Sequence, residues 1–184
     1  EGTLRDGYME IRWKMEKAIE GARDTIIRVN GDFAAAFGRD CGGTLWTYRR
    51  DDAKVLLVSM GSLATEATAA ADLLRGKGHA VGVVGIRAYR PFPREAVRSA
   101  LAGAEAILVF EKDISYGYEG ALCTDLKAAL YGTGIDAPIR GFIAGLGGRD
   151  VKATELAAAA ETAIGEIGNG QREKAAVWIN CVTE

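Results

Sequence analysis

The chain has 184 residues, of which 48% are hydrophobic and 26% are charged, and its formal net charge is −2. This composition is ordinary for a globular protein with a buried core, and the small net charge gives no global attraction to nucleic acid or to an anionic membrane surface. No apolar run approaches the roughly 20 residues that a membrane-spanning helix needs, and the polar N-terminus is unlike a signal peptide. We therefore expect one domain with appendages and neither nucleic-acid nor membrane partners.

The chain offers few ligands for soft metals. Cys41, Cys123 and Cys181 are far apart and form no C-x-x-C pair, whereas zinc and iron–sulfur sites usually show closely spaced thiols. With His79 as the single histidine, no metal site is expected. An odd number of scattered thiols favours a reducing cytoplasm over a secreted disulfide framework. Because the sequence begins with Glu1 rather than Met, we expect that it was cut from a longer chain.

Residues 10–29 form the clearest predicted helix. Apolar side chains recur every three or four residues along one face, and charged side chains fill the other face. The apolar positions are Ile11, Met15, Ala18, Ala22, Ile26 and Val29. Two interpretations stay open, because the helix either packs across its own domain or connects this domain to a partner that the chain lacks.

Residues 30–52 are predicted to be irregular, because glycines interrupt them repeatedly. Phe33 and Phe37 are expected to anchor this stretch to an apolar surface. A short edge strand is expected at Leu45, Trp46 and Tyr48. We interpret the stretch as a wrapped linker that leads into the main domain.

Four continuously apolar runs follow, and each precedes a stretch that is compatible with a helix. The runs are residues 53–60, 80–86, 105–110 and 137–145, and the helices are residues 63–77, 94–102, 119–131 and 153–167. Runs without alternation indicate strands covered on both faces, and their spacing suits right-handed βαβ crossovers. We predict an open three-layer α/β sandwich with a mostly parallel sheet, preceded by the long N-terminal helix. Residues 175–182 are expected to add a strand or to pack as an extended arm.

These elements divide the chain into a connector helix with its linker, residues 1–52, and a main α/β domain, residues 53–184. Ligands and partners of open α/β sheets gather beyond the carboxyl ends of the strands, so the loops that leave those ends are the candidate sites. In the first loop, Ser62 is expected to cap the following helix. The GxSxG pattern and a plausible histidine base are both missing there, so a nucleophilic serine is not expected.

The second loop is the segment IRAYRPFP, residues 86–93. Its two prolines favour an extended backbone at Arg90 and Phe92. The segment should therefore hold fixed the side chains of Arg87, Tyr89, Arg90 and Phe92. Paired arginines suit the recognition of a carboxylate or a phosphate. The alternative is that they form salt bridges to Glu111 or Asp113.

The third loop, EKDISYGYEG, begins with two carboxylates. Because Lys112 lies between Glu111 and Asp113, an ion-paired loop is favoured over an acid–base pair for catalysis. Tyr116 and Tyr118 lie among glycines, and tyrosine is typical of interfaces because it combines apolar area with a hydroxyl group. We therefore expect this loop to make contacts.

The fourth loop is GLGGRD, residues 145–150. Glycines before a helix can present backbone N–H groups to an anion, and Arg149 adds positive charge. However, the GxGxxG motif belongs after the first strand of a dinucleotide-binding fold, where this chain reads MGSLATE, and no GxxxxGK[ST] motif occurs. The alternative is a tight turn in which Arg149 and Asp150 pair with each other or face a neighbour.

Four blocks of the sequence, VLLVSMGS, IRAYRPFP, VFEKDISYGYEG and GFIAGLGGRDV, resemble in order and spacing the second domain of the α subunit of 2-oxoacid:ferredoxin oxidoreductases. Pyruvate:ferredoxin oxidoreductase, or pyruvate synthase, is the best-known member of that family. The N-terminal YMEIRWKMEKAIEGA and the final VWIN also resemble the later part of that subunit, so the resemblance covers nearly the whole chain. It implies a fold similar to the C-terminal domain of transketolase.

The resemblance also implies a function. Such complexes decarboxylate a 2-oxo acid oxidatively to an acyl-CoA and pass the electrons to ferredoxin, using thiamine diphosphate, Mg²⁺ and iron–sulfur clusters. The preceding domain, which helps to form the thiamine site, is absent from this sequence. We therefore expect no catalytic residue and no cofactor or metal ligand in this chain, which should be inactive in isolation. CoA and ferredoxin are expected partners of the complex as a whole.

The role that the resemblance suggests is a scaffold that packs other subunits or domains of a cytoplasmic complex around the active site. Its expected interface or rim residues are Arg87, Tyr89, Arg90, Phe92, Tyr116 and Arg149. One alternative is an independent α/β module that binds a small molecule or nucleotide at the GLGGRD and Gly61–Ser62 helix starts. A second alternative is the C-terminal domain of another transketolase-like enzyme. The sequence does not select the 2-oxo acid or the electron acceptor.

Overall fold

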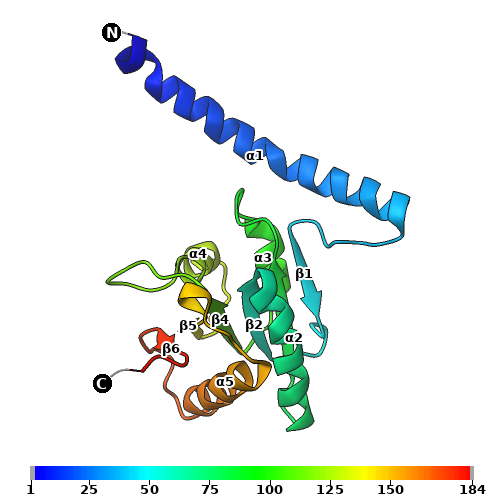
Figure 1. The fold of residues 1–184 in the computed structure, drawn as a ribbon, viewed down its shortest axis with the longest axis vertical. Helices are drawn as coiled ribbons and strands as arrows, with labels where there is room; N and C mark the ends of the chain where they lie inside the picture. The colour runs from blue at the N-terminus through cyan, green and yellow to red at the C-terminus, as the bar shows by residue number, and fades with distance from the viewer. Residues whose placement is uncertain (1–2, 183–184) are drawn as a thin grey trace.

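The computed structural model describes residues 3–182. Its main body is a six-stranded sheet with helices on both faces (Figure 1). The elements in chain order are α1 (Thr3–Phe37), β1 (Leu45–Tyr48), β2 (Val55–Met60), α2 (Gly61–Gly76), β3 (Val81–Ile86), α3 (Arg94–Leu101), β4 (Ala106–Glu111), α4 (Ala121–Leu130), β5 (Ile139–Ile143), the short 3₁₀ helix η1 (Leu146–Gly148), α5 (Ala153–Gly168) and β6 (Val177–Trp178). The predicted three-layer α/β architecture is confirmed.

The strands lie in the order β1-β3-β2-β4-β5-β6. Strands β2 to β6 are parallel, and β1 runs antiparallel to β3 at one edge. The expected edge strand around Trp46 is therefore present as β1. The expected strand in the tail is present as β6, which pairs with Phe142 and Ile143 of β5. The carboxyl ends of β2 to β5 consequently share one edge of the sheet.

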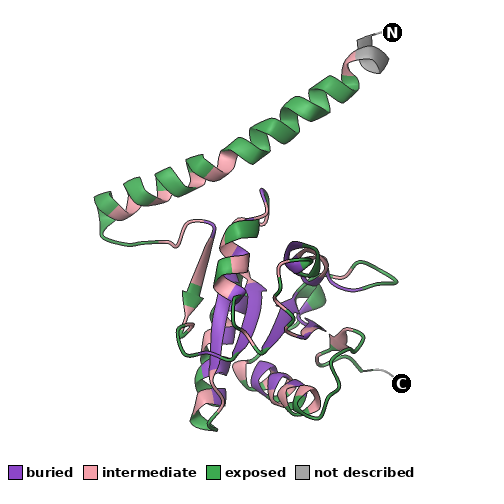
Figure 2. Ribbon diagram, turned by 180° about the vertical axis from the view of Figure 1, so that it is seen from behind, coloured by how far each residue is buried: buried purple, intermediate pink, exposed green. Residues whose placement is uncertain are grey.

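Alternate residues of each strand build two cores, one on each face of the sheet. Leu57 and Phe142 belong to the core under α2 and α5. Leu56 and Val109 belong to the core under α3 and α4. Figure 2 shows the central strands buried throughout. Because helices cover both faces, these strands are apolar at nearly every position, with Ser59 of β2 and Glu111 of β4 as buried polar exceptions, and this is the pattern that made them recognisable.

Helix α1 is longer than predicted and stands away from the body (Figures 1 and 2). It has 35 residues, Thr3–Phe37, where residues 10–29 were expected. It meets the body near its middle, where Arg23 donates a hydrogen bond to the carbonyl of Phe92 at 3.4 Å and lies 3.7 Å from the carboxylate of Glu95. It does not pack lengthwise across its own domain. Within the described part of the chain, no helix has the combined length and apolar character that crossing a membrane requires.

The prediction of an irregular stretch over residues 30–52 is wrong in its first part, because α1 continues to Phe37. The rings of Phe33 and Phe37 lie 4.7 Å apart on successive turns of the helix, so they support each other and do not anchor a linker. Gly38 then adopts a φ of 65°, and its N–H donates to the carbonyl of Ala34 at 2.8 Å. This left-handed glycine ends the helix.

Helix α2 begins earlier than predicted. It starts at Gly61, directly after β2, and Met60 occupies the N-cap position. The expectation that Ser62 caps this helix is therefore wrong. Gly61 adopts a φ of 59°, which turns the chain from strand to helix without an intervening loop.

Candidate functional site at the carboxyl ends of the strands

Loops that leave the carboxyl ends of β2 to β5 form a rim along one edge of the sheet. They are the turn at residues 60–62, where β2 passes directly into α2, and the loops 87–93, 112–120 and 144–152. The six interface residues expected from the sequence all lie on the last three of these loops. Because open α/β sheets bind their ligands and partners at this edge, the rim is the candidate functional site.

Arg90 is held on the rim by its neighbours. Its guanidinium pairs with the carboxylate of Asp125 on α4 at 2.7 Å and donates to the carbonyl of Tyr89 at 2.9 Å. It also lies 4.1 Å from the centre of the Tyr89 ring. The alternative of a salt bridge from Arg90 to Glu111 or Asp113 is wrong, because this loop passes α4 and brings Arg90 to Asp125 instead.

Tyr89 and Phe92 attach the segment to the protein core. Their rings meet edge to face at 6.1 Å, and both pack against the core cluster on the α3 and α4 side of the sheet. Burial raises the pKa of Tyr89 to about 12. Arg87 is exposed, and its backbone N–H donates to the carbonyl of Thr44 at 2.9 Å. The segment therefore presents Arg87 and Arg90 to solvent while its aromatic residues stay half-buried.

Two carboxylates at the end of β4 cap the start of α4. The carboxylate of Glu111, only 2% exposed, accepts the backbone N–H groups of Leu122 at 2.8 Å and Cys123 at 3.2 Å. Asp113 accepts the N–H of Ala121 at 3.1 Å. The first three N–H groups of α4 are thereby satisfied at the positive end of the helix dipole.

Burial raises the pKa values of two side chains at the start of α4, Glu111 and Cys123. It raises the pKa of Glu111 to about 7, although the two backbone N–H bonds act in the opposite direction. Burial also raises the pKa of the Cys123 thiol to about 12, so this cysteine is protonated and unreactive at neutral pH. The prediction that Glu111 and Asp113 form an ion-paired loop around Lys112 is wrong, because both carboxylates bind a helix start instead.

The loop 112–120 presents two tyrosines to solvent. Tyr116 is 91% exposed and Tyr118 is 70% exposed. The tip of the loop is an ordered turn, in which Ser115 donates to the carbonyl of Glu119 at 2.9 Å and Tyr118 donates to the carbonyl of Ser115 at 3.0 Å. Figure 1 shows the loop extending outward beside α4. Exposed rings on a fixed turn suit contact with another protein surface.

Arg149 of the GLGGRD loop reaches the C-terminal segment. Its guanidinium donates to the carbonyl of Asn180 and does not pair with Asp150. A small hollow of about 230 Å³ lies between this loop and the residues around Trp178. The loop therefore joins the end of β5 to the tail of the chain.

The start of α5 is occupied by carboxylates of the chain itself. The backbone N–H of Lys152 donates to Glu155 at 2.9 Å, and the N–H of Ala153 donates to Glu66 of α2 at 2.7 Å. These are the N–H groups that a bound phosphate would use. The arrangement therefore weighs against the interpretation of GLGGRD as a phosphate loop.

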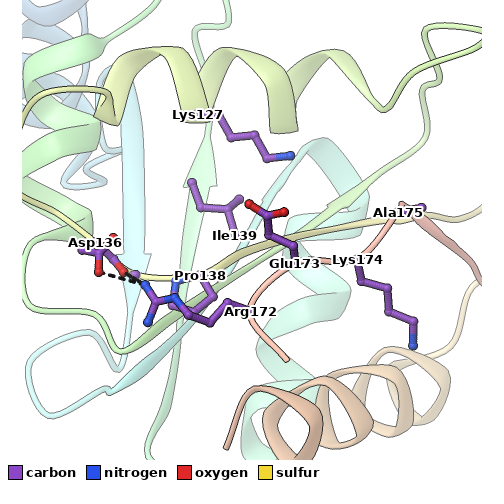
Figure 3. A pocket seen from close by; sticks show the side chains of 9 residues that line it. Lys127, Asp136, Pro138, Ile139, Arg172, Glu173, Lys174 and Ala175 are labelled. Carbon is purple, nitrogen blue, oxygen red and sulfur yellow. Dashed lines mark hydrogen bonds and ion pairs between the residues drawn. The ribbon is translucent and has the colours of Figure 1, made fainter. Parts of the chain in front are cut away.

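A larger hollow of about 650 Å³ lies away from the rim, at the amino end of β5 (Figure 3). It lies between α4 and residues 172–175. Arg172 pairs with Asp136 at 2.9 Å, as the dashed line shows, and Lys127 pairs with Glu119 at 2.5 Å. The lining contains no residue that the sequence singled out, and carboxylates of the chain already balance these two cations.

The described residues do not fit the cofactors that the sequence resemblance implies. Among the described residues, no group of three or more His, Cys, Asp or Glu side chains is placed to hold a metal ion. Cys41 is half-buried, Cys123 is buried and Cys181 is exposed, and all three are free. At the starts of α4 and α5, carboxylates fill the positions that a pyrophosphate would take. The described residues are therefore assigned no chemical step with thiamine diphosphate, Mg²⁺ or an iron–sulfur cluster.

The fold defines a class of protein, the transketolase-like α/β domain. A solved split-gene transketolase, an inactive β4 tetramer, matches 65% of this chain and 41% of its own chain with a TM-score of 0.50 and 21% identity, which shows a shared fold. Residues 53–156 match the family described as pyruvate:ferredoxin oxidoreductase core domain II, and the chain belongs to this family.

Two curated relatives support the assignment of the chain to this family. Pyruvate synthase subunit PorA of Methanothermobacter thermautotrophicus is 42% identical over 149 residues, which are 81% of this chain and 38% of the relative. Ketoisovalerate oxidoreductase subunit VorA of Pyrococcus horikoshii is 37% identical over 171 residues, which are 93% of this chain and 43% of the relative. The chain is thus domain II of a 2-oxoacid:ferredoxin oxidoreductase α subunit and spans less than half the length of these relatives. The resemblance identified from the four sequence blocks is confirmed.

Proposed function

We propose that this domain has a structural role in a thiamine-diphosphate-dependent 2-oxoacid:ferredoxin oxidoreductase of the cytoplasm. The complex would convert a 2-oxo acid and CoA to an acyl-CoA and CO₂ and pass the electrons to ferredoxin, with its catalytic centre in other domains or subunits. The chain alone is expected to be inactive. One relative is named for pyruvate and another for ketoisovalerate, so the choice of 2-oxo acid is not assigned.

The observation that carries this proposal is the exposed apolar surface of α1. Tyr8, Met9, Ile11, Trp13 and Met15 are 47% to 81% exposed. Because successive helical residues turn by about 100°, Met9 and Trp13 lie on a different side of α1 from the other three. Exposed apolar surface of this extent marks a protein interface. A helix that is apolar on more than one side suits a connector covered by more than one neighbour.

The rim supports the same role. Exposed Tyr116 and the exposed arginines Arg87, Arg90 and Arg149 are residue types enriched in protein interfaces. By contrast, the starts of α4 and α5 already bind carboxylates of this chain. The rim is therefore better suited to contact another protein surface than to bind a phosphate.

The test adds the chain to the other subunits and domains of the complex and measures assembly by size-exclusion chromatography with light scattering. Trp13→Ser should weaken assembly at least tenfold, since a tryptophan buried at the centre of an interface commonly contributes about 2 kcal/mol or more. The unfolding temperature of the chain alone should stay unchanged. Lys14→Ser, at the adjacent exposed position, is the matched control and should assemble normally. Unchanged assembly of the Trp13→Ser variant would contradict the proposed role of α1.

Thermal unfolding with and without added ligands tests the alternative of an independent nucleotide-binding module. A ligand that binds only the folded state raises the unfolding temperature. We expect no change with thiamine diphosphate, CoA or ATP. A saturable rise with any of them would contradict a purely structural role.

A further inference from the structure

We propose that one side of α1 pairs with the same side of α1 in a second copy of this chain, with the two helices antiparallel. This side carries an apolar stripe, which consists of Tyr8, Ile11, Met15, Ile19 and Ala22. Because successive residues turn by about 100°, all five lie within about 40° of the direction of Met15. The first four are 43% to 55% exposed, and Ala22 is half-buried. A continuous apolar stripe of this extent marks a protein interface.

The body of the domain leaves the stripe open. It contacts α1 through Arg23, which lies about 80° around the helix from Met15. A hollow of about 530 Å³ separates α1 from the body, and Glu16 and Ile19 border it. The body therefore lies on one flank of the stripe. Figure 2 shows the N-terminal half of α1 exposed and projecting beyond the body.

The stripe has the symmetry that pairing with a second copy requires. Its other members stand seven and four positions before Met15 and four and seven positions after it. A two-fold axis at Met15 thus places the two Met15 side chains together, Ile11 against Ile19, and the large Tyr8 against the small Ala22. A closed two-fold dimer is the commonest form of homo-oligomer. Tyr8 and Ile19 are 11 residues apart, as are Ile11 and Ala22, and this repeat departs little from the natural period of a helix.

The charges beside the stripe fit the antiparallel direction. Arg12 and Glu16 lie on the same flank, about 60° and 100° from Met15. The guanidinium of Arg12 lies 3.9 Å from the Met15 sulfur and 5.9 Å from the centre of the Tyr8 ring, so it runs along the stripe. Antiparallel pairing brings Arg12 of each copy beside Glu16 of the other, whereas parallel pairing brings it beside Lys14. Exposed ion pairs contribute little affinity, so they select the direction and the apolar stripe drives the pairing.

This inference does not rest on the proposed function, because the stripe and the side of α1 assigned there to other subunits are different surfaces. Met9 and Trp13 lie about 120° and 160° around the helix from Met15. They stay exposed when two stripes pair. Trp13→Ser should therefore leave the pairing of two copies unchanged, even though it weakens assembly with other subunits.

Sedimentation velocity of the whole 184-residue chain over about 1 to 200 μM measures the pairing. The range suits a weak dimer, because the stripe is smaller than the standard interface of about 800 Å² per partner. We expect the mass to rise from 19.5 kDa toward twice that value. Met15→Lys places two ammonium groups together at the two-fold axis and should weaken pairing at least a hundredfold. Met9→Lys is the matched control outside the stripe and should pair normally, since lysine preserves the helix at both positions.

Charge reversal tests the direction of pairing. Arg12→Glu and Glu16→Arg should each weaken the dimer about tenfold, because the two-fold axis repeats each like-charge contact. The double variant restores opposite charges and should recover the pairing. The proposal is overturned by a mass of 19.5 kDa at every concentration, by equal effects of Met9→Lys and Met15→Lys, or by a stronger dimer with Arg12→Glu, which would indicate parallel helices.

Discussion

Glu111→Gln is the most informative single substitution in the rim, because it removes a titratable group and keeps its shape. The folded protein buries the Glu111 carboxyl against the start of α4 and raises its pKa from 4.5 to about 7. The unfolded chain has no such environment. The carboxyl is therefore protonated in both states below pH 4. Between pH 4.5 and 7 only the unfolded state loses the proton, and the free energy of unfolding falls as the pH rises.

The magnitude follows from the size of the pKa change. Each unit of difference between the pKa values of the folded and unfolded states changes the free energy of unfolding by about 1.4 kcal/mol. The pKa of Glu111 rises from 4.5 to about 7. Glu111 should therefore lower the free energy of unfolding by about 3 kcal/mol between pH 4.5 and 7.5. Gln is neutral throughout, so this dependence should be absent from the variant. The variant should gain stability relative to the unaltered chain as the pH rises.

Urea denaturation of both proteins at a series of pH values measures this difference. The difference between their free energies of unfolding should change by about 3 kcal/mol across the interval. Circular dichroism at each pH should show that both proteins begin folded. A constant difference, or a variant that loses stability relative to the unaltered chain as the pH rises, would refute the assigned environment of Glu111.

Two further predictions concern packing and charge. Gly120→Ala should destabilise the domain by roughly 1–3 kcal/mol, because its Cβ would lie 1.9 Å from the Glu111 carboxyl carbon. Gly31→Ala, with nothing within 4 Å, should stabilise helix α1 locally by about 1 kcal/mol and should not destabilise the domain. Chemical denaturation measures both, and equal effects would contradict the close packing at Gly120. Glu166→Gln should destabilise the domain at neutral pH and have less effect as the pH falls. The reason is that Lys174 first, and then Arg140, hold the pKa of folded Glu166 below 4.5. The stabilisation by the ionised carboxylate is therefore present above pH 4.5 and is lost as the pH falls through the lowered pKa of the folded state. A destabilisation that persists undiminished at pH 3 would show that this ion pair does not stabilise the fold.

The central strands could be predicted because burial on both faces leaves a signal in every residue of a strand. The run around Leu56 and Leu57 is apolar without alternation, and both residues are fully buried. The extent of α1 could not be predicted in the same way. Glycines between residues 31 and 43 favoured a linker, whereas the pairing of Phe33 with Phe37 supports the helix to its end. A pairing one turn apart is weaker evidence in a sequence than a glycine.

The contacts of the rim residues could not be predicted from the sequence, because their partners come from elements that are distant in the chain. Lys112 is the neighbour of Glu111 in sequence, but the start of α4 is its neighbour in space. A signal was present, because Glu111 directly continues the buried run of β4, and Gly120, later in the chain and directly before α4, leaves room for its carboxyl. Arg140 similarly interrupts an apolar strand, and a charged residue in a strand covered on both faces requires buried partners. The partners themselves, Glu166 and Gln171, cannot be identified from the spacing.

The proposal that other parts of the complex cover this domain is tested most directly by hydroxyl-radical footprinting with mass spectrometry. The method reports the exposure of Met9, Trp13 and Tyr116 in the chain alone and in the assembled oxidoreductase. All three are exposed in the isolated chain, so their oxidation should be rapid. We predict that assembly slows the oxidation of Met9 and Trp13 at least severalfold and also protects Tyr116. Equal oxidation rates in the two states would contradict the proposal that α1 and the rim are interfaces.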